Sequence, residues 1–260
     1  MGIVKIAVIQ YDIAWLNRDA NFEQLAPLVE EAVGNGARLV VLPEMFSTGF
    51  AMGSQWAEQL PEPFDGPSSK FLRETAVQYS IWITGSCAEI PKNPGADTRP
   101  ANTLVLASPA GELSRYEKIH PFSYGGEDKW FRSGSHTLTV AIENVRVSFF
   151  ICYDIRFGEH FWRLANETDV FVIPANWPES RREHWLNLLT ARAIENQTYV
   201  IGCNRVGTGG GLSYVGDSRV IGPFGETVAD AANNEGIIYA EITAQTVRET
   251  REKYPFLRDR

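Results

Sequence analysis

Three apolar segments of this sequence run directly into polar or reactive side chains. Glu44 follows one of them after a proline, Cys152 follows the second, and Asn176 lies shortly beyond the third. If these segments are strands, the three side chains lie at the carboxyl edge of a sheet, where α/β folds bind their ligands. The alternative at each position is an ordinary turn.

Cys152 has the most specific chemical potential of the three. A helical pattern begins within a few residues of it, so the sequence predicts a thiol on a strand-to-helix turn, which exposes a nucleophile and directs backbone N–H groups toward it. A nearby helix N-terminus or cation favours the reactive thiolate. The alternative is a buried structural cysteine. Cys87 and Cys203 lie inside apolar strand patterns, and we assign both to that structural role.

A nucleophilic thiol needs a proton acceptor and groups that stabilise the oxyanion formed on attack. The four histidines lack suitable partners and zinc-site spacing, and the sequence has no Cys-x-x-Cys. A carboxylate serves as the acceptor where burial raises its pKa. Lys118, at the end of a predicted strand, is placed to direct its ammonium at the oxyanion. A solvated surface lysine is the alternative.

The elements that must position these residues alternate in type. Apolar and alternating patterns predict strands at 4–10, 38–42, 81–89, 102–107, 112–118, 137–142, 145–151, 170–173, 199–204, 218–221 and 236–240, with a short one near Tyr214. Helical spacing is found at 22–33, 68–79, 157–166 and 180–197. Parallel units mixed with hairpins predict an α/β layered domain with mixed sheets.

Local signals add detail to this pattern. Pro27 is expected to kink the first helix or delay its start. Ser180 and Glu183 have the spacing of a capping box at the start of the clearest helix. The glycine-rich segment 207–211 is interpreted as a flexible crossing loop, because a strand pattern rather than a helix follows it. The segment 222–225 is interpreted as a hairpin turn.

Composition narrows the functional class. The 260 residues are 44% hydrophobic and 22% charged, without a linker-like shift, which predicts a single domain over 1–260. A net charge of −8 argues against a nucleic-acid partner. No apolar run approaches the roughly 20 residues of a membrane span, and the apolar start lacks the features of a signal peptide. With only three scattered cysteines, a cytoplasmic protein is expected.

The segments 42–44, 116–120 and 151–157 together resemble the carbon–nitrogen hydrolase (nitrilase) superfamily. They carry a glutamate, a lysine and a cysteine in that family's order, and the similarity extends over nearly the whole chain. The resemblance implies a four-layer αββα sandwich with two mixed sheets. It also implies pairing into a homodimer or a higher homo-oligomer, and a reaction that needs no metal or organic cofactor.

The resemblance also implies a role for each matching residue. Glu44 corresponds to the general base and Cys152 to the nucleophile. Lys118 stabilises the tetrahedral intermediate together with the backbone N–H of Tyr153. Glu127 matches a second glutamate that often assists in amidases of this family.

Within the superfamily, the sequence Cys-Tyr-Asp-x-Arg-Phe is typical of amidases, and the segments 174–178, 184–185, 191–197, 202–207 and 216–218 resemble the bacterial omega-amidase branch. That branch implies hydrolysis of alpha-ketoglutaramate or alpha-ketosuccinamate to a 2-oxo acid and ammonia, with water and the small amide as the only reactants. The alternatives are an aliphatic amidase, an N-carbamoyl amidohydrolase, an enzyme that transfers the acyl group to an acceptor other than water, and a non-catalytic binding protein on this fold.

An omega-amidase must also hold the carboxylate of its substrate. Arg156, one turn beyond the nucleophile, has a planar fork suited to this task. The alternative is a salt bridge with Asp154 or another nearby acid. Phe46, Tyr124 and Trp177 are the predicted pocket walls, and the helix at 180–197 and the tail at 247–260 are the predicted subunit interface.

Overall fold

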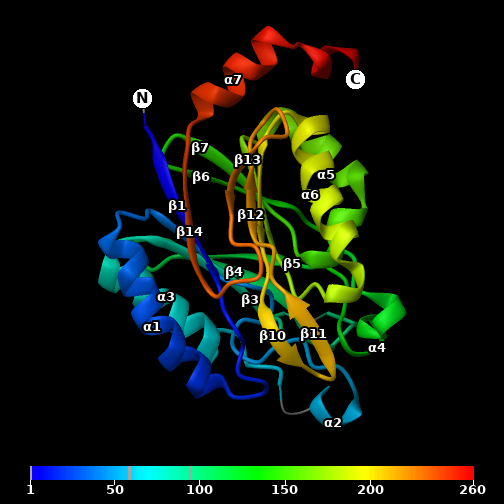
Figure 1. The fold of residues 1–260 in the computed structure, drawn as a ribbon. Helices are drawn as coiled ribbons and strands as arrows, with labels where there is room; N and C mark the ends of the chain where they lie inside the picture. The colour runs from blue at the N-terminus through cyan, green and yellow to red at the C-terminus, as the bar shows by residue number, and fades with distance from the viewer. Residues whose placement is uncertain (1, 58–59, 94) are drawn as a thin grey trace.

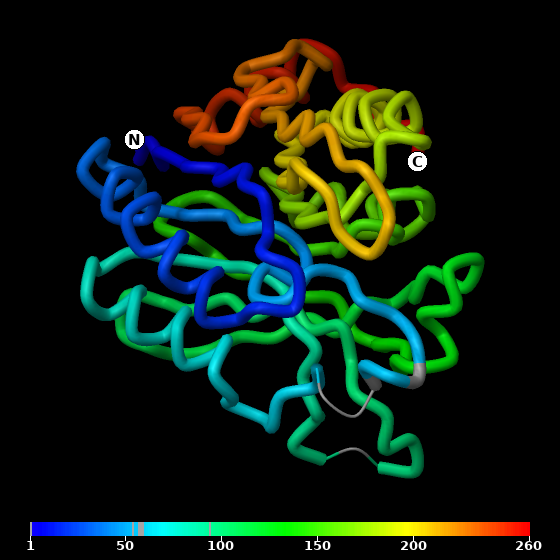
Figure 2. Tube along the Cα trace, turned by 60° about the horizontal axis from the view of Figure 1, so that its bottom comes forward, coloured from blue at the N-terminus to red at the C-terminus, as the bar shows by residue number. Residues whose placement is uncertain are grey.

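Two six-stranded sheets pack face to face, and helices cover the outer face of each sheet (Figure 1). The structure is a computed structural model that describes residues 2–57, 60–93 and 95–260. The predicted four-layer αββα sandwich with two mixed sheets is confirmed. Figure 2 shows that most of the blue-to-cyan part of the chain lies on one side of the molecule and most of the yellow-to-red part on the other.

Each sheet is parallel near its centre and antiparallel toward its edges. From edge to edge, the first sheet consists of β14 (Gly236–Ile242), β1 (Val4–Gln10), β2 (Leu39–Val41), β3 (Trp82–Glu89), β4 (Ala101–Ala107) and β5 (Leu113–Glu117). The second consists of β13 (Thr227–Asp230), β12 (Arg219–Ile221), β9 (Tyr199–Cys203), β8 (Val170–Pro174), β7 (Val145–Phe149) and β6 (Leu138–Ile142). Only β13 lacks a counterpart among the predicted strands of these two sheets.

Four helices form the outer layers (Figure 1). The first sheet is covered by α1 (Arg18–Gly34) and α3 (Pro67–Tyr79), and the second by α5 (Gly158–Leu164) and α6 (Arg182–Asn196). Shorter elements are α2 (Ser54–Ala57), α4 (Glu127–Trp130), α7 (Ala244–Lys253) and the 3₁₀ turns η1 (Ser123–Gly125), η2 (Cys152–Arg156), η3 (Ala165–Glu167), η4 (Glu179–Arg181) and η5 (Phe256–Asp259). A bilayer-spanning helix is not found in the described part of the chain.

The central strands are apolar throughout because both of their faces are buried. On β1, Ile6 and Val8 point into the core between the sheets, while Ala7 and Ile9 pack toward α1 and α3. All four side chains are fully buried. A strand covered on one face only would alternate apolar and polar residues, so these continuous apolar runs follow from the four-layer architecture.

The parallel strands bring their carboxyl ends to the same edge of the sandwich. In the first sheet β2 leads into Glu44, and in the second β7 and β8 lead toward Cys152 and Asn176. The hairpin β4–β5 ends beside them, and Lys118 follows β5 directly. The strands that the sequence predicted before these residues are present, and polar or reactive residues follow them at this edge.

The glycine-rich segment is a correction to the sequence prediction. It is not a crossing loop but the turn of a hairpin formed by β10 (Val206–Gly209) and β11 (Leu212–Val215). Gly210 and Gly211 have φ values of 57° and 78°, which suit a two-residue turn that side-chain-bearing residues adopt only with strain. The predicted turn at 222–225 is confirmed, because it connects β12 to β13.

Two helix starts also differ from prediction. Pro27 does not delay α1, which begins at Arg18 with the side chain of Asn17 as its N-cap. The exposed position of Pro27 lets water satisfy the carbonyl that loses its helical partner. The capping box at Ser180 and Glu183 is wrong, since Ser180 lies inside the 3₁₀ turn η4 and α6 starts only at Arg182 without a side-chain cap.

A substitution at Gly134 tests how closely the backbone is packed at the end of β5. Its N–H donates to the carbonyl oxygen of Lys118 at 2.8 Å, and an added Cβ would lie 2.1 Å from the carbonyl oxygen of Glu117. We expect Gly134→Ala to lower the free energy of unfolding by about 1–3 kcal/mol, because backbone must move to relieve the overlap. Urea unfolding measures this change. Gly34→Ala is the control, since no atom lies within 4 Å of its added Cβ, and an equal effect of both variants would contradict the prediction.

Candidate active site

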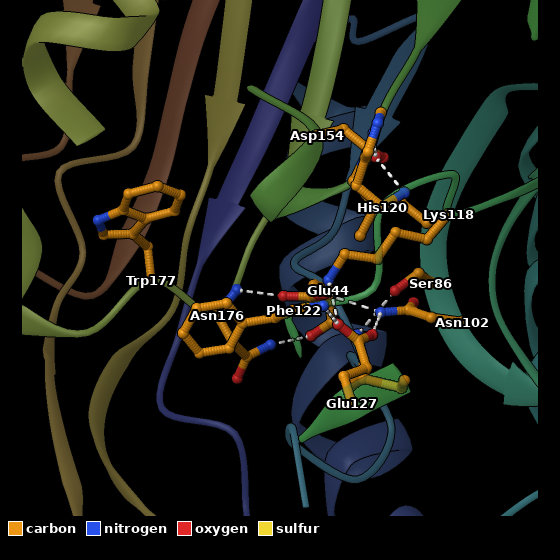
Figure 3. Close-up of polar contacts among 12 residues, drawn as sticks. Glu44, Ser86, Asn102, Lys118, His120, Phe122, Glu127, Asp154, Asn176 and Trp177 are labelled. Atoms are coloured by element: carbon orange, nitrogen blue, oxygen red, sulfur yellow. Dashed lines mark hydrogen bonds and ion pairs between the residues drawn. The ribbon is translucent and has the colours of Figure 1, made fainter. Parts of the chain in front are cut away.

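Glu44 is held by donors from three different segments. Its Oε1 accepts hydrogen bonds from Lys118 Nζ and Asn102 Nδ2, both at 2.8 Å. Its Oε2 accepts from the backbone N–H of Asn176 at 2.8 Å, and the Asn176 side-chain amide donates to the Glu44 carbonyl oxygen (Figure 3). The carboxylate is completely buried. The two sheets therefore fix its orientation from both sides.

Glu127 shares two of these donors. Lys118 Nζ donates to its Oε2 at 2.9 Å, and Asn102 Nδ2 donates to its Oε1 at 3.0 Å. The backbone N–H of Phe122 also donates to Oε2, at 2.5 Å. Lys118 and Asn102 thus bridge two carboxylates that are both fully buried (Figure 3).

The protonation states follow from this arrangement. Burial alone would lower the pKa of the Lys118 ammonium, but the carboxylates of Glu127 and Glu44 hold its pKa above the usual range. Burial raises the pKa of Glu127, and the negative charge of Glu44 adds to this effect against the opposing attraction of Lys118. Lys118 is therefore a permanent cation, and Glu127 is the carboxyl that takes up a proton more readily than an exposed glutamate.

Cys152 lies beside this cluster at the first position of η2. Its φ is 45°, in the left-handed region, which is the strained strand-to-helix turn that the sequence predicted. Burial raises the pKa of the thiol, and the nearby Glu44 raises it further, while Lys118 and the backbone N–H of Asn176 act in the opposite direction. Only 9% of the residue is exposed, so attack by this sulfur requires a base that removes its proton.

Asp154 connects η2, which begins with Cys152, to β5 and the residues that follow it. Its Oδ2 accepts from the backbone N–H of Ile151 at 3.0 Å and from the Tyr116 hydroxyl at 2.8 Å. Its Oδ1 accepts from the backbone N–H of His120 at 2.9 Å and lies 3.1 Å from the His120 ring nitrogen. Because the carboxylate is fully buried and bonded on both sides, it fixes the position of Cys152 relative to Lys118.

These groups line one pocket at the edge of the sandwich. Its polar lining includes Glu44, Lys118, Cys152 and Asn176. Aromatic and apolar side chains surround them, and two arginines complete the wall. Among the residues that the structure describes, His, Cys, Asp and Glu do not gather into a group of three or more that could hold a metal ion.

The predicted substrate-binding residues divide into two groups. Arg156 and Trp177 line the pocket, as does Tyr153, which was predicted as the backbone oxyanion donor. Phe46 does not, because it is fully buried in the core with the rings of α1 and α3. Tyr124 does not line it either, since 89% of its surface is exposed.

Arg156 is not bound to Asp154 as the alternative reading required. Its guanidinium lies 4.9 Å from the Trp177 ring and within 3.0 Å of His184 Nδ1. No carboxylate pairs with it in the described ranges. Its charge therefore remains available to the pocket.

Sequence reasoning missed several residues of the site. Asn102 is the first residue of a predicted strand and was not identified as a site residue. Phe50, Phe122, Arg181, Leu212 and Tyr214 also line the pocket. Phe50 and Phe122 occupy the roles predicted for Phe46 and Tyr124, a few residues away in the same loops. Their orientation depends on how each loop turns, which strand periodicity does not specify.

Comparisons with known proteins agree with this geometry. The family model described as carbon-nitrogen hydrolase matches residues 5–252. Omega-amidase YafV of Escherichia coli (strain K12) is 37% identical over 259 residues, covering 98% of this chain and 96% of that protein. The 2-oxoglutaramate amidase of Bacillus subtilis (strain 168) is 32% identical, with coverage of 98% and 96%.

A solved structure gives the same result. XC1258 from Xanthomonas campestris, described as a CN-hydrolase superfamily protein with an arsenic adduct in the active site, superposes with a TM-score of 0.92. It is 31% identical and covers 100% of this chain and 98% of its own. The chain therefore belongs to the carbon–nitrogen hydrolase family, and it is a hydrolase of carbon–nitrogen bonds other than peptide bonds.

Lys118→Met tests the charge balance of the cluster. The variant loses the main interaction that lowers the pKa of Glu127, so that pKa rises further. A carboxyl whose pKa is higher in the folded than in the unfolded state binds more protons when folded, and stability then falls as pH rises. We expect the free energy of unfolding to be about 3–5 kcal/mol below wild type at pH 8. We expect a smaller deficit at pH 5.

Urea unfolding between pH 5 and pH 8 measures both quantities. Lys129→Met is the matched control, because Lys129 is exposed on the same short helix as Glu127. A deficit for Lys118→Met that does not change with pH would contradict the assignment of the buried charges.

Proposed function

We propose that this protein is an omega-amidase. It hydrolyses the terminal carboxamide of a short 2-oxo acid, 2-oxoglutaramate (alpha-ketoglutaramate) or its shorter analogue alpha-ketosuccinamate, to the carboxylate and ammonia. The proposal rests on Cys152 lying in a pocket beside the buried cluster of Glu44, Lys118 and Glu127. Full-length similarity to an omega-amidase and a 2-oxoglutaramate amidase supports the choice of substrate.

The first step is attack of the Cys152 sulfur on the amide carbon. Because the pKa of the thiol is raised, the sulfur starts as a thiol and Glu44 accepts its proton as the bond forms. The contacts from Lys118, Asn102 and Asn176 hold the Glu44 carboxylate in one orientation. This fixed geometry lowers the entropic cost of the proton transfer.

The oxyanion that forms on attack requires donors already in place. The Lys118 ammonium and the backbone N–H of Tyr153 fill this role. Tyr153 is the second residue of η2, and the first N–H groups of a helix have no acceptor within it. Loss of one such donor typically lowers kcat by about 10²–10³-fold.

Two further steps complete the reaction, collapse of the tetrahedral intermediate and hydrolysis of the thioester. Glu44 returns its proton to the departing nitrogen, the C–N bond breaks, and ammonia leaves a thioester on Cys152. Water, deprotonated by Glu44, attacks the thioester carbonyl and releases the carboxylate and the thiol. Glu127 assists by holding Lys118 and Asn102 in place through its own hydrogen bonds.

We further propose that the whole chain acts as one domain in the cytoplasm and assembles as a homodimer. The exposed apolar side chains Trp162, Ile194, Phe224 and Phe256 lie on or beside α5, α6 and the C-terminal tail. Arg260 packs its guanidinium 4.2 Å from the Trp162 ring, which places the tail against α5. Exposed apolar surface of this kind is typical of a subunit interface.

Light scattering tests the assembly. We expect a mass about twice that of one chain at micromolar concentration, because the apolar surface on α6 and the tail is buried only by a second copy. Ile194→Glu places a charge in that surface and is expected to shift the mass toward one chain. A wild-type protein of single-chain mass would contradict the proposed interface.

Ammonia release from 2-oxoglutaramate tests the reaction. We expect turnover by the wild type and none above background by Cys152→Ala, which lacks the nucleophile. Cys87→Ala is the control, because Cys87 is buried in the core of the first sheet away from the pocket, and it should retain activity. Wild-type turnover of propionamide as fast as of 2-oxoglutaramate would contradict the omega-amidase assignment, and activity in Cys152→Ala would contradict the thioester route.

A further inference from the structure

Arg181 lines the active-site pocket with a guanidinium that the protein does not neutralise. The hydrogen bonds and ion pairs within the described ranges include none from this guanidinium. The next residue, Arg182, shows the usual arrangement, since it forms a two-pronged ion pair with the buried carboxylate of Asp217. An arginine that faces a pocket with all of its donors free is suited to binding an anion.

The structure holds Arg181 in this position from two sides. The Trp177 indole N–H donates to the Arg181 carbonyl oxygen at 2.7 Å. The guanidinium lies 5.1 Å from the centre of the Phe122 ring, and Phe122 donates its backbone N–H to Glu127. The cation is therefore positioned by the same two loops that line the pocket around Cys152.

Arg156 is the other arginine of the pocket, and neighbouring side chains already contact its guanidinium. One of its nitrogens lies 3.0 Å from His184 Nδ1. Its guanidinium stacks near the rings of Trp177, at 4.9 Å, and Tyr153, at 5.7 Å. With these contacts, Arg156 forms part of the pocket wall and adds positive electrostatic potential. Its guanidinium is less available than that of Arg181 for two parallel hydrogen bonds to a carboxylate.

We propose that Arg181 is the specificity-determining residue that binds the substrate carboxylate remote from the scissile amide. The proposal rests on the omega-amidase function and assigns its anion site to a residue that the sequence pattern did not indicate. The bond is a bidentate ion pair between the guanidinium fork and the carboxylate, formed over the Phe122 ring. In a protein with a net charge of −8, this local positive potential selects anionic amides over neutral ones.

This role has a kinetic signature. The remote carboxylate does not change charge during the reaction, so its ion pair stabilises the bound substrate and the transition state equally. Loss of the pair then raises KM and leaves kcat nearly unchanged. A residue that merely supports the fold would lower turnover of every substrate.

The experiment compares Arg181→Gln, Arg181→Lys and Arg156→Gln with wild type on two substrates. One is 2-oxoglutaramate, and the other is pentanamide, which has the same chain length and no charge. For Arg181→Gln we expect KM for 2-oxoglutaramate to rise about 10- to 100-fold, with pentanamide kinetics unchanged. Arg181→Lys should recover part of the loss, because it restores the charge without the fork. The inhibition constant of the product 2-oxoglutarate should rise by a similar factor.

Arg163→Gln is the matched control, since it removes an exposed arginine of α5 that does not line the pocket. If Arg181→Gln keeps the preference for 2-oxoglutaramate and Arg156→Gln loses it, the inference is overturned and the omega-amidase function stands. If Arg181→Gln lowers kcat for both substrates alike, the residue is structural and the inference also fails. If the wild type itself does not prefer 2-oxoglutaramate, both the function and the inference are wrong.

Discussion

The buried ammonium of Lys118 holds two buried carboxylates, and the chemistry of the site depends on that contact. Two carboxylates side by side in a low-dielectric interior repel each other and lose their hydration. Lys118, with the amide of Asn102, bonds to both and makes their burial tolerable. The same contact places a permanent cation beside the sulfur of Cys152. In the mechanism that we propose, the cation that makes this burial tolerable is also the group that stabilises the developing oxyanion.

Cys152 and Asn176 lie beside this cluster because the two sheets share one edge. Glu44, Asn102 and Lys118 come from the first sheet, and Cys152 and Asn176 come from the second. The inter-sheet core brings these edges together through ordinary apolar packing. Asp154 then adds a polar connection, because its carboxylate bonds to both the cysteine turn and the end of β5. The positions of Cys152 and Lys118 are thus fixed from the ends of strands, while the surrounding loops form much of the pocket wall.

In the function that we propose, those loops determine which amide is bound. The hairpin β10–β11 brings Leu212 and Tyr214 to the pocket, and η4 brings Arg181. Hydrogen bonds hold these segments to the rest of the fold, such as those from the Trp177 indole to the Arg181 carbonyl and from the Arg205 guanidinium to the Thr208 carbonyl. The selectivity that we propose for a charged substrate therefore depends on segments other than the strand ends that carry Glu44, Lys118 and Cys152.

The sequence by itself predicted all but one of the strands of the two large sheets, and the family resemblance implied the four layers and the grouping of Glu44, Lys118 and Cys152. Strands that are buried on both faces are apolar throughout. A polar or reactive residue that follows such a strand therefore stands out in the sequence, and Glu44 and Cys152 became candidates for this reason. Lys118 was a candidate from its place at the end of a predicted strand, the family's order of glutamate, lysine and cysteine supported it, and Glu127 was added as the match to a second glutamate of that family. Only the tertiary structure decided that Asn102 bridges the two carboxylates, and that Phe50 and Phe122 rather than Phe46 and Tyr124 line the pocket. The physical reason is that periodicity reports which face of an element is buried, whereas the direction of a loop side chain depends on contacts with segments far away in the chain.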